Sequence, residues 1–147
     1  MPQIQAPKGI VLHVEDDAAV AASTELLLRL AGFRTAQATD GESALRLVID
    51  GGLHPDVLIV DSNLPGDLDG GETVEALCRA LHDSLPTILL SGELANATLP
   101  WVPGAPLWPM AKPAQPDLLV HAVETFAALH HWRLAHDGPS AEMPRCA

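Results

Sequence analysis

Several short apolar runs of this sequence are followed directly by acidic, hydroxyl or amine side chains, which are the groups that active sites use. The clearest case is the run of residues 57–60, Val-Leu-Ile-Val, which ends in Asp61. Such a run is too short for a helix and is typical of a strand buried on both faces of a parallel sheet. The polar residues that follow the other apolar runs in this way are Glu15, Asp16, Ser91 and Lys112.

Parallel strands bring their carboxyl ends to one edge of a sheet, where open α/β sheets bind ligands, so we expect these side chains to cluster. Carboxylates that share a site repel one another and attract a cation. An acidic site built of oxygen ligands favours Mg²⁺ or Mn²⁺ over zinc. Lys112 adds a positive charge and Ser91 a hydroxyl, the groups that a phosphoryl group requires around its oxygens. Together the residues predict an acyl-phosphate site with Asp61 as the nucleophile.

Alternating strands and helices are expected to position these groups. The pattern predicts strands at residues 9–14, 33–38, 56–60, 87–90 and 107–110, and helices at 18–30, 42–49, 71–81 and 115–136. In the first helix, Val20, Leu26, Leu27 and Leu30 have helical spacing. Alternation with short connections indicates an α/β fold with a doubly wound, five-stranded parallel sheet.

The alternation breaks after Ser91. Residues 94–98 allow barely a helical turn before four prolines follow, at positions 100, 103, 106 and 109. Proline removes a backbone donor and disrupts helix interiors, so the fourth helix should be short, distorted or missing. The last strand carries Pro109, which is tolerated at the edge of a sheet.

Composition narrows the classes of function. The 147 residues suit one domain. Eight basic and nineteen acidic residues give a net charge of -11, which argues against direct nucleic-acid binding. We find no targeting segment and no run long enough to span a membrane, and Cys78 and Cys146 suggest neither a disulfide framework nor a metal-binding pair. A cytoplasmic location is expected.

Four segments of the chain resemble a known family. They are V-L-H-V-E-D-D, V-L-I-V-D-S-N-L-P-G-D-L-D-G, T-I-L-L-S-G-E and M-A-K-P-A. Each segment lies at a predicted strand end, and the four follow one another in the order that the family has. On these motifs the chain resembles a response-regulator receiver domain of two-component signal transduction. The resemblance covers about residues 8–136 and leaves residues 137–147 as a C-terminal tail.

The resemblance implies a flavodoxin-like α/β/α fold and a site with assigned roles. Asp61 would be the phosphoacceptor, and the donor would be a histidine kinase or a phosphotransfer protein. Asn63 and Glu93 stand where the family tunes the hydrolysis of the phosphoryl group. The metal ligands would be Glu15, Asp16, Asp61 and the backbone carbonyl of Asn63 for Mg²⁺, and the groups contacting the phosphoryl oxygens would be Ser91 and Lys112.

The chain departs from the family pattern on its expected output face. Pro109 stands three residues before Lys112, where many members carry Tyr or Phe. Trp108 should point to the other face of its strand. Together with the proline-rich residues 95–106, this predicts an altered output face. Trp101 and Trp108 are either loop anchors or an exposed patch for a partner.

Four of the histidines are expected to have structural roles. His13 lies inside a buried strand, so it should be a hydrogen-bonded or helix-packed core residue. His130, His131 and His136 lie late in the last helix, where positive charge favours the helix dipole.

The leading hypothesis is a stand-alone receiver, a phosphorylated signalling switch rather than an enzyme, that acts on an unknown downstream protein or in a phosphorelay. Homodimer formation stays open, and no membrane partner is expected. One alternative is a phosphorylation-independent interaction module with the same fold. Another is a phosphatase of the haloacid dehalogenase type, whose Asp-x-Asp-x-Thr or Val pattern E-D-D-A-A does not supply.

Overall fold

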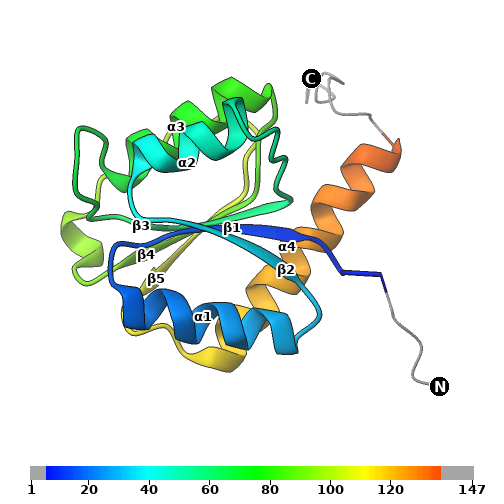
Figure 1. Cartoon of the computed structure of the whole chain (residues 1–147), viewed down its shortest axis with the longest axis horizontal. Coiled ribbons are helices and arrows are strands. Elements are labelled where there is room, and N and C mark those ends of the chain that lie inside the picture. Colours follow the sequence, from blue (N-terminus) through cyan, green and yellow to red (C-terminus); the bar gives the residue numbers. More distant parts are fainter. Residues whose placement is uncertain (1–5, 137–147) are drawn as a thin grey trace.

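A five-stranded parallel sheet forms the centre of the molecule, with the strand order β2-β1-β3-β4-β5 (Figure 1). The computed structural model describes residues 6–136. The strands are β1 (Ile10–Val14), β2 (Arg34–Ala38), β3 (Val57–Asp61), β4 (Thr87–Ser91) and β5 (Leu107–Ala111). The helices are α1 (Ala18–Leu30), α2 (Gly41–Ile49), α3 (Gly70–Leu81), the 3-10 helix η1 (Leu94–Asn96) and α4 (Pro116–His136).

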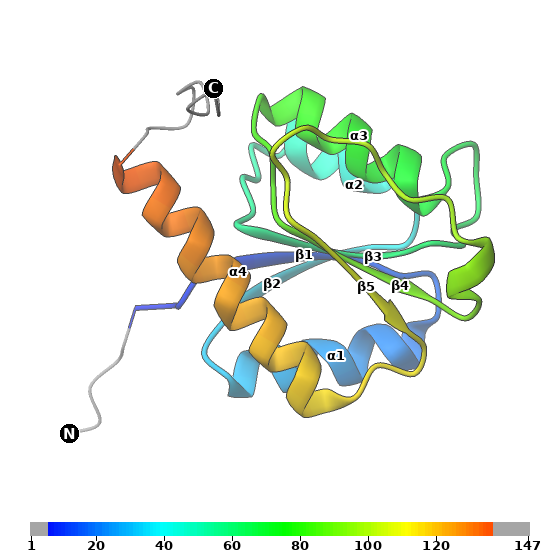
Figure 2. The same ribbon diagram turned by 180° about the vertical axis from the view of Figure 1, so that it is seen from behind.

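Helices cover both faces of the sheet, so the predicted α/β/α fold is confirmed. Helices α1 and α4 lie on one face and α2 and α3 on the other, as the two opposite views show (Figures 1 and 2). One hydrophobic cluster lies on each side, and strands β3 and β4 are buried along their whole length. Among residues 6–136, no helix is long and apolar enough to cross a membrane.

The predicted disruption after β4 is also confirmed. Only the single turn η1 stands where a fourth crossover helix would lie, and the chain then runs through the prolines to the edge strand β5. Pro109 is paired only with β4 in the sheet, at Leu89, so its missing N–H interrupts no inner strand. Trp101 on this segment is 78% exposed, whereas Trp108 packs edge-on against Phe126, with ring centroids 6.2 Å apart.

Helix α1 covers the predicted residues, Ala18–Leu30, but only part of its apolar surface is buried. Asp17 caps it by accepting hydrogen bonds from the N–H groups of Ala19 and Val20. Its buried residues, however, are Thr24 and Leu28, while Leu26 is 61% and Leu30 79% exposed. Apolar residues occur around much of this helix, so spacing alone did not identify which side faces the sheet.

His13 is a buried core residue as expected, but the hydrogen-bonded alternative does not apply. The ring is buried in β1, but neither nitrogen has a hydrogen-bond partner among the described residues. Burial, together with the charge of Lys112, lowers the pKa of His13 to about 4. The side chain is therefore a neutral core residue and not a hydrogen-bonded one.

Candidate functional site

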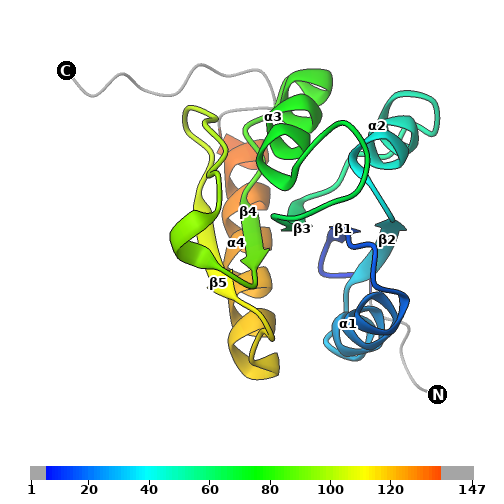
Figure 3. The ribbon, with the colours of Figure 1, turned by 90° about the vertical axis from the view of Figure 1, so that its left-hand side faces the viewer.

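The carboxyl edge of the sheet brings an amine and two carboxylates into direct contact. Figure 3 looks onto this edge, where the connections after β1, β3, β4 and β5 meet. The Lys112 Nζ donates to Glu15 Oε1 at 2.7 Å and to Asp61 Oδ2 at 2.7 Å. Asp61 is the last residue of β3, Glu15 follows β1 and Lys112 follows β5. The strand-end pattern thus assembled groups that are far apart in the sequence, as expected.

The loop after β3 holds the Asp61 carboxylate from its other side. The N–H of Asn63 donates to Asp61 Oδ1 at 3.0 Å. Helix α3 begins against this loop at Gly70, whose N–H donates to the Ser62 carbonyl at 3.1 Å. A Cβ on Gly70 would overlap the Asp61 carbonyl oxygen, so only glycine allows the helix to start this close to the strand end.

An acidic trio at this edge fits a hard divalent cation. Carboxylate oxygens of Glu15, Asp16 and Asp61 all lie within 4.8 Å of one another. Glu15 and Asp61 are buried, whereas Asp16 is exposed. Among the described residues Glu15 Oε2 is buried without a hydrogen-bond partner, an arrangement that costs free energy unless a cation or another donor meets it. An oxygen-only donor set of this kind suits Mg²⁺.

The surroundings shift the pKa values of Glu15, Asp61 and Lys112. Burial, followed by the neighbouring Asp61, raises the pKa of Glu15 to about 7. Burial also acts to raise the pKa of Asp61, but hydrogen bonds with Glu15, Lys112 and the Asn63 N–H lower it overall. Burial acts to lower the pKa of Lys112, and its contacts with Asp61 and Glu15 raise it overall. Asp61 therefore keeps its negative charge and Lys112 its positive charge at neutral pH.

Ser91 ends β4 beside a polar cavity of about 510 Å³. Its Oγ accepts a hydrogen bond from the Glu93 N–H at 3.1 Å, and its carbonyl accepts one from the Lys112 N–H at 2.8 Å. Its hydroxyl has no hydrogen bond to Asp61 or to the Lys112 amine. Ser91 is therefore not part of the ion pairs that Lys112 forms with Glu15 and Asp61. The cavity is lined by Ser62, Asn63, Asp69, Ser91, Gly92, Glu93, Asn96, Ala97 and Thr98.

Comparison with known proteins identifies the family. The sequence model of the response regulator receiver domain matches residues 11–124. The chain belongs to the response regulator receiver family. Phosphorylation-dependent signalling is the general function of this family. The haloacid dehalogenase alternative is thereby left without support.

Individual relatives agree with this family. The transcriptional regulatory protein PrrA of Mycobacterium tuberculosis is 46% identical over 83 residues, which are 56% of this chain and 34% of PrrA. The DNA-binding response regulator MtrA of Mycobacterium leprae is 34% identical over 117 residues, 77% of this chain and 48% of MtrA. The receiver thus spans about a third to a half of the length of these relatives.

Solved structures show the same fold. A putative response regulator from Chloroflexus aurantiacus superposes with a TM-score of 0.63 at 33% identity, covering 83% of this chain and 98% of that one. The N-terminal domain of a three-domain response regulator from Carboxydothermus hydrogenoformans superposes with a TM-score of 0.73 at 25% identity, covering 85% and 98%.

An apolar groove of about 620 Å³ borders the receiver's charged edge. It lies between α1 and the start of α4, and Lys112 is one of its lining residues. The exposed Leu26 and Leu30 of α1 also line it. The helical spacing of these two leucines was predicted from the sequence, but the open groove that they line was not.

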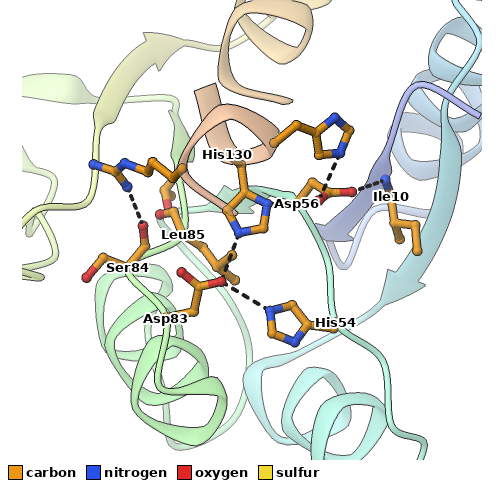
Figure 4. Close-up of polar contacts among 10 residues, drawn as sticks. Ile10, His54, Asp56, Asp83, Ser84, Leu85 and His130 are labelled. Carbon is orange, nitrogen blue, oxygen red and sulfur yellow. Dashed lines mark hydrogen bonds and ion pairs between the residues drawn. The ribbon is translucent and has the colours of Figure 1, made fainter. Parts of the chain in front are cut away.

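A second polar cluster, at the opposite edge of the sheet, was not predicted (Figure 4). His130 of α4 is buried between two acids, with Nδ1 2.8 Å from Asp56 Oδ1 and Nε2 2.8 Å from Asp83 Oδ2. Burial acts to lower the pKa of His130, but the bonds with Asp56 and Asp83 raise it to about 9. His130 lies late in α4 as expected, but its two acidic partners were not predicted. The only sequence signal was Asp56, directly before β3.

Proposed function

We propose that this receiver domain, at residues 8–136, accepts a phosphoryl group on Asp61 from a histidine kinase or a phosphotransfer protein. The observation that carries the proposal is the contact of the Lys112 amine with both Asp61 and Glu15 at 2.7 Å. It keeps one carboxylate ionised beside a fixed positive charge, which suits a nucleophile that must receive a negatively charged group. The domain would act as a signalling switch on other proteins rather than as an enzyme on a separate substrate.

The transfer would form a bond between an Asp61 carboxylate oxygen and phosphorus and break the donor's phosphorus–nitrogen bond. Lys112 would stabilise the negative charge on the phosphoryl oxygens, and the Ser91 hydroxyl, beside the polar cavity, would donate to one of them. Glu15, Asp16, Asp61 and the Asn63 carbonyl would hold Mg²⁺. When bound, the ion supplies further positive charge to those oxygens.

DNA contact is not part of this proposal. The names of the relatives describe transcriptional and DNA-binding regulators, and this chain spans about half of MtrA. With a net charge of -11, these residues lack the basic surface that neutralises a phosphate backbone. We propose that the receiver signals through a protein partner.

Phosphorylation can be measured directly with acetyl phosphate. With Mg²⁺ present, we expect the wild-type protein to gain the mass of one phosphoryl group, and beryllofluoride with Mg²⁺ to change tryptophan fluorescence. Asp61→Asn should lose both responses, because an amide is not a nucleophile for phosphorus. Asp67→Asn is the matched control, since Asp67 is an exposed acid in the same loop. No response in the wild type, or an unchanged one in Asp61→Asn, would contradict the proposal.

The apolar groove supports a protein as the phosphodonor. A donor that delivers a phosphoryl group to Asp61 must cover the surface around Lys112, and Lys112 also lines the groove. Its lining between α1 and α4 is largely aliphatic, which suits the apolar face of a partner helix. We propose that the kinase or phosphotransfer protein docks there.

Leu30→Glu tests this docking. We expect phosphotransfer from a donor protein that phosphorylates the wild type to slow by at least roughly tenfold, because a charge enters a desolvated contact. Phosphorylation by acetyl phosphate should be unchanged, since the small donor needs no groove. Ile49→Glu is the matched control, because Ile49 is equally aliphatic and exposed but lies on α2. Equal slowing in both variants, or in neither, would refute docking at the groove.

A further inference from the structure

The cluster around His130 brings together side chains of metal-ligand type from separate segments (Figure 4). His54 comes from the connection before β3, Asp83 from the connection after α3, and His130 from α4. One ligand atom from each lies within 4.8 Å of the other two. No part of this cluster belongs to the proposed phosphorylation site, which lies at the other edge of the sheet.

The distances are close to those around a small metal ion. Asp83 Oδ2 lies 2.8 Å from His130 Nε2 and 3.1 Å from His54 Nε2. In a tetrahedral zinc site with bonds of roughly 2.0–2.1 Å, neighbouring ligand atoms are roughly 3.3 Å apart. Movements of a few tenths of an ångström would bring both of these distances to the spacing around such an ion. His54 is partly exposed, so this side chain can move and solvent can reach the site.

Outer contacts hold His130 in the orientation that such a site needs. Its Nδ1 contacts Asp56 Oδ1 at 2.8 Å, which leaves Nε2 facing Asp83 and His54. Asp56 is held in turn by the Ile10 N–H, at 2.8 Å from its Oδ2. Histidines that bind metals almost always donate their other N–H to a carboxylate or a carbonyl, which fixes the ring and strengthens the ligand. The pair Asp56–His130 has this arrangement.

The donor set defines the class of ion. Two imidazole nitrogens and one carboxylate oxygen favour zinc or a related transition metal over Mg²⁺, which prefers oxygen ligands. We propose that His54, Asp83 and His130 bind one Zn²⁺ ion, with Asp56 orienting His130 and water completing the coordination. The ion takes the place of the proton on His130 Nε2, which leaves to solvent. The site would tie α4 to the connections before β3 and β4.

The test titrates the metal-free full chain with ZnCl₂ in excess Mg²⁺ at about pH 8, where Zn²⁺ must still displace the proton from His130 Nε2. Calorimetry should give one site with a dissociation constant in the micromolar range or below. Co²⁺ in place of Zn²⁺ should give visible absorption bands of a low-coordinate site. His54→Gln removes one ligand at a partly exposed position and should weaken Zn²⁺ binding at least tenfold. His121→Gln removes an exposed histidine elsewhere on α4 and should change nothing.

Two results would overturn the proposal. One is the absence of stoichiometric Zn²⁺ binding by the wild type. The other is equal affinity in the wild type and in His54→Gln, or equal weakening in His54→Gln and His121→Gln, because either pattern indicates scattered surface histidines. Unfolding of both variants in EDTA shows whether they are folded. If His54→Gln does not fold, Asp83→Asn replaces it in the same comparison.

Discussion

Replacing His130 with leucine is expected to lower the free energy of unfolding by about 3 kcal/mol in EDTA at about pH 6. Breaking a buried charge network by removing one partner typically costs roughly 3–5 kcal/mol, because the remaining charges stay desolvated. The lower end applies because Asp83 keeps its contact with His54, and Asp56 keeps the Ile10 N–H and His131. Urea unfolding of both proteins measures the difference. His121→Leu, exposed on the same helix, should stay within about 0.5 kcal/mol of wild type.

The effect of His130 should depend on pH with a defined sign. Its pKa rises from 6.5 in the unfolded chain to about 9 in the folded protein, which corresponds to roughly 3 kcal/mol. A raised pKa stabilises the fold fully below pH 6.5, and the contribution is lost as the pH rises through about 9. The difference between wild type and His130→Leu should therefore shrink between about pH 6 and pH 10. A difference that is constant over this range would show that His130 is not held as a cation.

Lys112→Met is expected to slow phosphorylation by acetyl phosphate about 100-fold, since removing one preplaced charge-stabilising donor typically costs roughly 10²–10³ in rate. The variant also removes the positive charge that separates Glu15 from Asp61, so the pKa of Asp61 should rise. Mass spectrometry over time, with Mg²⁺ and acetyl phosphate, gives the rate.

Lys8→Met is the control for Lys112. Lys8 pairs with Glu124 on the surface, far from the carboxyl edge of the sheet, so its loss should not change the rate. A rate in Lys112→Met within about threefold of wild type would mean that the amine does not stabilise the transferring group. Circular dichroism of both variants checks that the comparison is made between folded proteins.

The phosphorylation edge was accessible to sequence reasoning because one geometric rule covers it. Parallel strands end at the same edge, so an acid after β1, an acid at the end of β3 and a lysine after β5 had to lie near one another. The positions of Glu15, Asp61 and Lys112 follow from that rule. The raised pKa of Glu15 does not follow from it, because that shift comes from the burial of the carboxylate and from the neighbouring Asp61.

The His130 cluster could not be found in the same way. Asp56 and Asp83 are 74 and 47 residues from His130, and only the docking of α4 onto the sheet brings them together. A similar limit explains α1. Its apolar residues are spaced for a helix, but its rotation about its own axis is set by packing against α4 and the sheet, which buries Leu28 and leaves Leu30 open.

The connection between β4 and β5 has a consequence for how this protein can change over evolutionary time. None of residues 92–106 is fully buried, and apart from Val102, which packs against the hydrophobic cluster on the α2–α3 side, substitutions there disturb little of the core. In a domain whose other crossovers are full helices on the sheet, this stretch can vary at little cost in stability. Natural variants should therefore differ most along residues 99–106, and a new binding specificity can arise there while the residues that line the cavity beside Ser91 stay the same.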